Sequence, residues 1–97
     1  MPRREERAKI IHTALMDALD AEHVQVEDDS ALHAGHPGAQ GGGGHYRVLV
    51  VSPRFEGLSR VAAQRLVYQA LGSLMATDIH ALEMRTLTPD QWRKSGR

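Results

Sequence analysis

The stretch that decides the fold is YRVLVVS, residues 46–52 of a chain of 97 residues. Its VLVV run is apolar and mostly β-branched, a composition typical of a strand inside a sheet. Pro53 follows directly and lacks the backbone N–H that a further ladder position would need. The sequence therefore predicts a central strand here, around which the other elements are arranged.

Two more strands are predicted, one on each side of this stretch in the sequence. Residues 23–28 and 79–87 alternate between apolar and polar side chains, as a strand with one buried face does. We expect the first of them to pair with the central strand. In residues 79–87, period-two counting places His80 on the same face as Leu82 and on the opposite face from Ile79.

Helices are predicted before, between and after the strands. Residues 4–21 and 59–75 carry apolar residues at helical spacing, with Ser59 as an N-cap and a break expected near the start of the second helix. Residues 88–91 read TPDQ, which matches a capping box with proline at the first helical position. We expect the short helix that follows to dock Trp92 on the core.

The order helix, strand, strand, helix, strand, helix describes an α+β fold, in which helices pack on a small three-stranded sheet. The length predicts a single domain that spans residues 1–97. Residues 29–44 contain Pro37 and a run of four glycines at 41–44, so we expect a flexible Gly-rich loop there.

The composition excludes several classes of function. Twelve Lys and Arg balance 12 Asp and Glu, whereas a dedicated nucleic-acid binder usually has a basic excess. Cysteine is absent, so disulfides and thiolate nucleophiles are excluded, while six His could bind metal. Neither Ser52 nor Ser59 lies in a nucleophile motif, and an enzyme is not expected.

The location of the protein is inferred from segments that the sequence lacks. The N-terminal MPRREERA has no apolar run typical of a signal peptide, and its two Glu argue against a transit peptide. No segment approaches the roughly 20 apolar residues of a membrane span. We expect a cytoplasmic protein, or a mitochondrial-matrix protein in a eukaryote, without a membrane partner.

Short motifs along the chain, taken together and in this order, resemble the BolA family. They span nearly the whole sequence and are DDS at 28–30, HAGHPGA at 33–39, HYRV at 45–48, VS at 51–52, FEGLS at 55–59, RLVY at 65–68, IHAL at 79–82 and TPDQW at 88–92.

The resemblance implies a fold shared with class II KH domains and a partnership with monothiol glutaredoxins. The two proteins would share a [2Fe–2S] cluster together with glutathione, and the isolated chain, a monomer, would hold none. Some family members are described as transcriptional regulators, so the alternative function is nucleic-acid binding by the KH-like fold.

The resemblance also implies the metal ligands. The family's C-terminal ligand falls on His80, and the second ligand comes from the loop between the first two strands, where His33 and His36 are the candidates. His45 is a lower-ranked candidate because it resembles a structural position at the strand edge. Without the resemblance, His80 would more simply be a strand residue hydrogen-bonded at the sheet margin.

Partner contacts are expected from Arg65 and Tyr68 on the second helix, together with His80. Other members often carry a basic or His-containing triplet in that helix. This chain has Ala62, Ala63 and Gln64 before Arg65 and so departs from the family pattern there. The glycines at 41–44 join two strands and not two helices, so they do not match the phosphate-clamping loop of KH domains.

Overall fold

A computed structural model describes residues 4–28, 44–77 and 79–95. The predicted order of helices and strands and the bounds of two strands are confirmed, while the predicted Gly-rich loop lies outside the described residues except for Gly44. The elements are α1 (Arg4–Leu19), β1 (His23–Asp28), β2 (Gly44–Val51), the 3-10 turn η3 (Pro53–Phe55), α2 (Arg60–Leu71), α3 (Leu74–Thr77), β3 (Ile79–Leu87) and α4 (Pro89–Lys94).

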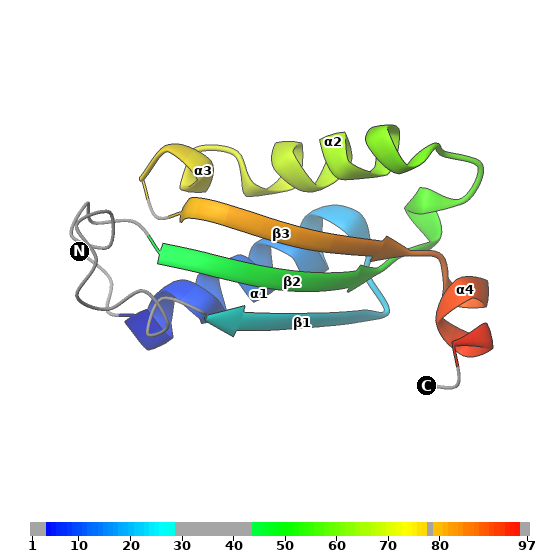
Figure 1. Cartoon of the computed structure of the whole chain (residues 1–97), viewed down its shortest axis with the longest axis horizontal. Coiled ribbons are helices and arrows are strands. Elements are labelled where there is room, and N and C mark those ends of the chain that lie inside the picture. Colours follow the sequence, from blue (N-terminus) through cyan, green and yellow to red (C-terminus); the bar gives the residue numbers. More distant parts are fainter. Residues whose placement is uncertain (1–3, 29–43, 78, 96–97) are drawn as a thin grey trace.

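The sheet has the order β1-β2-β3, so β2 is central as predicted. β1 pairs with β2 in antiparallel fashion, and His23 lies opposite Val51. β2 pairs with β3 in parallel, with Val51 opposite Leu87, and the connection between them runs through α2 and α3. A helical crossover of this kind is what a parallel strand pair requires. Figure 1 shows α1 behind the sheet and α2 alongside β3.

The core lies between one face of the sheet and the two longer helices. Each element contributes the residues that its own periodicity brings to one side, every second residue of a strand and every third or fourth of a helix. The buried residues are Ile11, Leu15 and Leu19 of α1, Tyr46, Val48 and Val50 of β2, Ala63, Val67 and Leu71 of α2, and Phe55 of η3. Such burial is the main favourable contribution to folding.

A buried serine joins four elements at one end of the sheet. Ser52 is fully buried, and its hydroxyl donates to the carbonyl oxygen of Leu19 at 2.5 Å and accepts from the backbone N–H of Arg54 at 3.0 Å. Its backbone N–H donates to the carbonyl oxygen of Leu87 at 3.0 Å. Ser52 thereby links the ends of α1, β2 and β3 to η3.

Two helices end at residues with a left-handed backbone. The predicted helix 59–75 is interrupted near its end and not near its start, because Gly72 (φ 52, ψ −125) ends α2 before α3 begins. Only glycine adopts such dihedrals without strain. Asp20 (φ 48) likewise ends α1 two residues before the predicted position at residue 21.

The caps of the later helices are as predicted. The Ser59 side chain accepts a hydrogen bond from the N–H of Ala62 at 3.1 Å at the start of α2. At the start of α4, Thr88 and Gln91 form the capping box in both directions.

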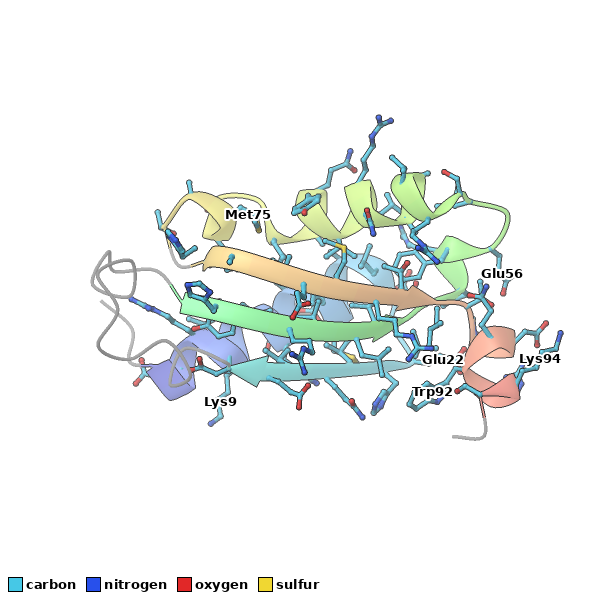
Figure 2. The ribbon with its side chains drawn as sticks, viewed as in Figure 1. Lys9, Glu22, Glu56, Met75, Trp92 and Lys94 are labelled. Carbon is cyan, nitrogen blue, oxygen red and sulfur yellow. The ribbon has the colours of Figure 1, made fainter. Side chains whose placement is uncertain are left out.

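Trp92 does not join the core, and its predicted docking there is wrong. Its ring stacks on His23, with ring centroids 4.8 Å apart and an angle of 21° between the planes. Because β1 starts where β2 and β3 end, α4 emerges beside the first residue of β1. Figure 2 shows Trp92 at this end of the sheet, where Glu22 precedes β1.

Candidate functional site

Two histidines lie together at the opposite end of the sheet. His45 is the second residue of β2 and His80 is the second residue of β3, and because these strands are parallel both start at the same end. The ring centroids are 5.1 Å apart and the ring planes are inclined at 40°. The tertiary structure thus brings together His80, the predicted C-terminal ligand, and His45, the candidate that the sequence ranked lowest.

A bulge in β3 sets the orientation of His80. Gly44 lies opposite Ile79 while His45 lies opposite Ala81, so His80 is an extra residue between two ladder positions. Ile79 is 5% exposed and belongs to the core, whereas His80 is exposed.

The predicted faces of β3 are therefore corrected at its start. Leu82 packs against the same core cluster as Ile79, although period-two counting had separated these two residues. The bulge inserts one residue and shifts the alternation by one position, which leaves His80 exposed beside His45.

The last glycine of the glycine run has a specific role beside this pair. A Cβ at Gly44 would lie 2.5 Å from the Tyr46 ring, far inside the van der Waals distance. Gly44 therefore allows the buried Tyr46 ring to fold back along β2. Because side chains alternate along a strand, His45 then points to the face of β2 away from the core.

The geometry of the pair fits two ligands of one metal centre. Two imidazoles that each bind a metal through a nitrogen at about 2 Å have ring centres roughly 5 Å apart. The 5.1 Å between His45 and His80 agrees with this spacing. Imidazole is also a known replacement for cysteine on a cluster iron.

The pair is nevertheless only part of a coordination sphere. Within residues 4–28, 44–77 and 79–95, no group of three or more His, Cys, Asp or Glu side chains could hold a metal ion. His33 and His36, the predicted loop ligands, lie outside the described residues. Because the chain has no cysteine, any thiolate ligand of a cluster iron must come from another molecule.

The predicted partner residues lie on α2. Arg65 is exposed and Tyr68 is 44% exposed, and in the described part of the chain no hydrogen bond, ion pair or ring contact joins either of them to His80. Val61, which is 56% exposed, lies on the same side of α2, four residues before Arg65. Val61 was not among the predicted partner residues, although its helical spacing from Arg65 and Tyr68 indicates the same side of the helix.

The other described histidines lie away from the pair. His12 is exposed on α1, and His23 stacks on Trp92. Among the described residues, every helix is too short or too polar to cross a membrane. Together, the fold and the site define a small α+β domain that presents two imidazoles at one end of its sheet.

Comparison with known proteins identifies the family. The family model for BolA-like proteins matches residues 15–91. Human BolA-like protein 1 is 42% identical over 85 residues, which are 88% of this chain and 60% of that protein. The "DNA-binding transcriptional regulator BolA" of Vibrio cholerae is 38% identical over 85 residues, or 88% of this chain and 77% of that protein.

Solved structures agree with this assignment. The solution structure of mouse BolA1 is 37% identical with a TM-score of 0.76, and the match covers 94% of this chain and 72% of the mouse chain. The BolA domain of Arabidopsis thaliana SufE1 is 36% identical, with a TM-score of 0.75, and the match covers 87% of this chain and 93% of that one. The chain belongs to the BolA family. It spans about three fifths (60%) of the length of human BolA-like protein 1.

Proposed function

We propose that this chain is a non-enzymatic partner protein, which binds a monothiol glutaredoxin and shares a [2Fe–2S] cluster with it. The observation that carries the proposal is the pair of His45 and His80, 5.1 Å apart at one end of the sheet. A chain without cysteine has no thiolate to offer iron, so the thiolate ligands come from the glutaredoxin cysteine and from glutathione.

His80 is the principal ligand in this proposal, and the second comes from His33, His36 or His45. The residues on both sides of His80, Ile79 and Ala81, pair with Gly44 and His45 of β2, which limits the positions that the His80 ring can take. His45 is held in the same way by β2. Because the two rings are 5.1 Å apart, we consider His45 a stronger candidate for the second ligand than the sequence suggested.

The exposed side of α2 supplies further contacts with the glutaredoxin. Tyr68 has a partly exposed ring and Arg65 a charged group without an ion-pair partner in the described part of the chain. Tyrosine and arginine are residues over-represented among those that dominate binding energies at interfaces. Val61 extends the same surface by an apolar side chain.

A titration tests the proposal. The purified chain is added to a monothiol glutaredoxin loaded with a [2Fe–2S] cluster and glutathione, and visible absorption and circular dichroism are recorded. We expect the spectrum of the cluster-loaded glutaredoxin to change to that of a mixed, His-ligated cluster. The variant His12→Ala, which removes an exposed histidine of α1, serves as the control and should behave as the wild type. An unchanged spectrum at saturating chain would reject the proposal.

The second candidate function is nucleic-acid binding. It is favoured by the name of the Vibrio cholerae relative, which is a DNA-binding transcriptional regulator. The balance of 12 basic and 12 acidic residues gives it less support, because neutralised phosphates supply most of the affinity for DNA. A binding constant for duplex DNA that falls steeply with salt concentration would favour this function over the first.

A further inference from the structure

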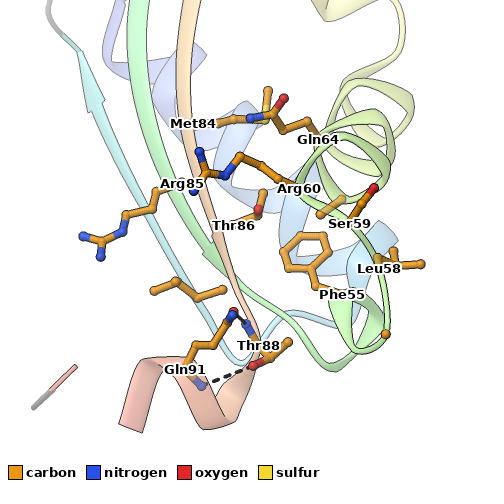
Figure 3. A pocket seen from close by; sticks show the side chains of 13 residues that line it. Phe55, Leu58, Ser59, Arg60, Gln64, Met84, Arg85, Thr86, Thr88 and Gln91 are labelled. Atoms are coloured by element: carbon orange, nitrogen blue, oxygen red, sulfur yellow. Dashed lines mark hydrogen bonds between the residues drawn. The ribbon is translucent and has the colours of Figure 1, made fainter. Parts of the chain in front are cut away.

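A groove lies between the start of α2 and the C-terminal half of β3. It is a hollow of about 640 Å³, and Figure 3 shows Arg60 and Gln64 of α2 across it from Met84 and Thr86 of β3. None of the residues that line it is acidic, although the chain has 12 Asp and Glu. Along β3, Thr86 is six residues from His80, or about 20 Å in an extended strand. The groove is therefore separate from the histidine pair.

One wall of this groove is the free edge of a strand. β3 pairs with β2 on one side only and is the last strand of the sheet. In the described part of the chain, Met84, Arg85 and Thr86 make no backbone hydrogen bond other than those of the ladder. An open strand edge of this kind can pair with an extended peptide, whose backbone has matching donors and acceptors.

Two arginines flank this edge from opposite sides. Figure 3 shows Arg60 reaching from α2 toward β3, while Arg85 extends from the other side of the strand, over the open face of the sheet. Neither guanidinium has a hydrogen-bond or ion-pair partner within residues 4–28, 44–77 and 79–95.

On the open face of the sheet, another arginine has the acidic neighbours that Arg85 lacks. Arg47 of β2 lies between two glutamates, with a nitrogen 3.9 Å from Glu27 and another 3.3 Å from Glu83. Two residues further along the strands, Gln25, Leu49 and Arg85 lie side by side, and none of Arg85's neighbours across the sheet is acidic. A fourth strand beside β3 would place a side chain next to Arg85 in the position that Glu83 occupies for Arg47.

We propose that the groove binds an acidic peptide segment of a partner protein, which adds to the edge of β3 as a fourth strand. One carboxylate of the segment faces Arg60 and another faces Arg85. Since successive side chains of a strand point to opposite faces, the two acidic residues are adjacent or an odd number of positions apart. The ladder supplies affinity and the two arginines select the sequence.

The groove fits a peptide better than a nucleic acid. Phe55, the aromatic residue that lines it, is 4% exposed and presents no face on which a base could stack. A strand edge also matches the repeat of a polypeptide backbone and not that of a sugar-phosphate chain.

A synthetic peptide tests this inference. The probe is a fluorescent, capped heptapeptide of Thr and Val with a central Glu-Asp pair, and binding is followed by fluorescence anisotropy. We expect Arg60→Gln and Arg85→Gln each to raise Kd about threefold to fivefold, as the loss of an exposed ion pair does. Lys9→Gln removes an exposed cation of α1 and should leave Kd unchanged.

Two modified peptides test the geometry. A peptide with the Glu and Asp two positions apart should bind more weakly than the adjacent pair, because both carboxylates then point to one face. N-methylation of a backbone nitrogen that faces β3 should weaken binding further by removing a ladder hydrogen bond. Equal affinity for all three peptides, or no binding of the first, would overturn the proposal.

A single-stranded oligonucleotide is the competing ligand. If a 12-mer of deoxythymidine displaced the peptide and bound more tightly, the groove would be a nucleic-acid site and the inference would be wrong. NMR amide shifts of Met84, Arg85 and Thr86 on peptide addition would support it. None of these measurements involves the cluster, so they can fail while the glutaredoxin titration succeeds.

Discussion

At the scale of single residues, the position of His80 depends on one inserted residue. The bulge between Gly44 and His45 on one strand and Ile79 and Ala81 on the other leaves His80 exposed, with its ring beside His45. A bulge commonly redirects a side chain next to a functional site. The same insertion keeps Ile79 in the core while His80 stays exposed.

Replacement of His80 by Ala should separate folding from cluster binding. Since the ring is exposed, we expect the free energy of unfolding to change by less than about 0.5 kcal/mol. The His-ligated spectrum of the mixed complex should be lost, whereas binding to apo glutaredoxin should persist because it depends on the wider interface. Absorption, circular dichroism and calorimetry with the two proteins would measure these effects.

The other histidines rank below His80 in this series. Single changes His33→Ala and His36→Ala should weaken the cluster complex less, because a neighbouring histidine can substitute. His45→Ala should weaken it more than either if His45 is the second ligand. If the double loop variant destroyed the spectrum while His80→Ala left it unchanged, the site would lie in the loop.

Ser52→Ala should destabilise the fold by about 1 to 3 kcal/mol, because the backbone groups that it bonds stay buried without a partner. The hydroxyl bonds both the carbonyl of Leu19 and the N–H of Arg54, so two elements lose their contact with β2. Urea unfolding would measure the change. Ser95→Ala removes an exposed hydroxyl at the end of α4 and should change stability by less than about 0.5 kcal/mol. Equal effects would show that the burial of Ser52 is not important.

At the scale of elements, the break between α2 and α3 affects how the chain packs before β3 begins. Gly72 turns the chain after α2, and α3 then packs beside β3, near the start of which His80 lies. The break ends α2 at Leu71 and so allows α3 to pack beside β3.

Gly72→Ala should destabilise the protein by more than about 1 kcal/mol, since φ 52 with ψ −125 is strained for any residue with a Cβ. Thermal unfolding would show a lower midpoint. Ser73→Ala, at the next position, keeps the glycine and provides the control. A Gly72→Ala variant as stable as the wild type would mean that the chain can turn here with other dihedrals.

At the scale of the whole molecule, β3 connects two sites. The histidine pair lies at its start and the groove flanked by Arg60 and Arg85 lies toward its end. About 20 Å of strand separate His80 from Thr86. On α2, however, Val61 of the proposed glutaredoxin surface is next to Arg60 of the groove, so the two proposed partners would be neighbours there.

The isolated chain should not retain a cluster. It has no thiolate, and its described histidine pair offers only two of the ligands that the irons need. After chemical reconstitution and desalting without glutaredoxin or glutathione, we expect a colourless protein that elutes as a monomer. A stable coloured monomer under these conditions would contradict the proposed function.

The sequence by itself determined the order of the elements, the bounds of β1 and β3 and both helix caps. Periodicity, proline positions and capping residues are local, so they act between neighbours in the chain. The motif IHAL made His80 a candidate ligand only through its resemblance to the BolA family, and that role stays a prediction.

Only the tertiary structure decided which residues meet. The contact of His45 with His80, the stack of Trp92 on His23 and the arginines on either side of β3 all depend on strand register and direction. The bulge at His80 shifts that register by one residue, and no local pattern marks it. Register is set by the packing of the whole sheet against α1 and α2, because a shift of one position would turn buried side chains toward water.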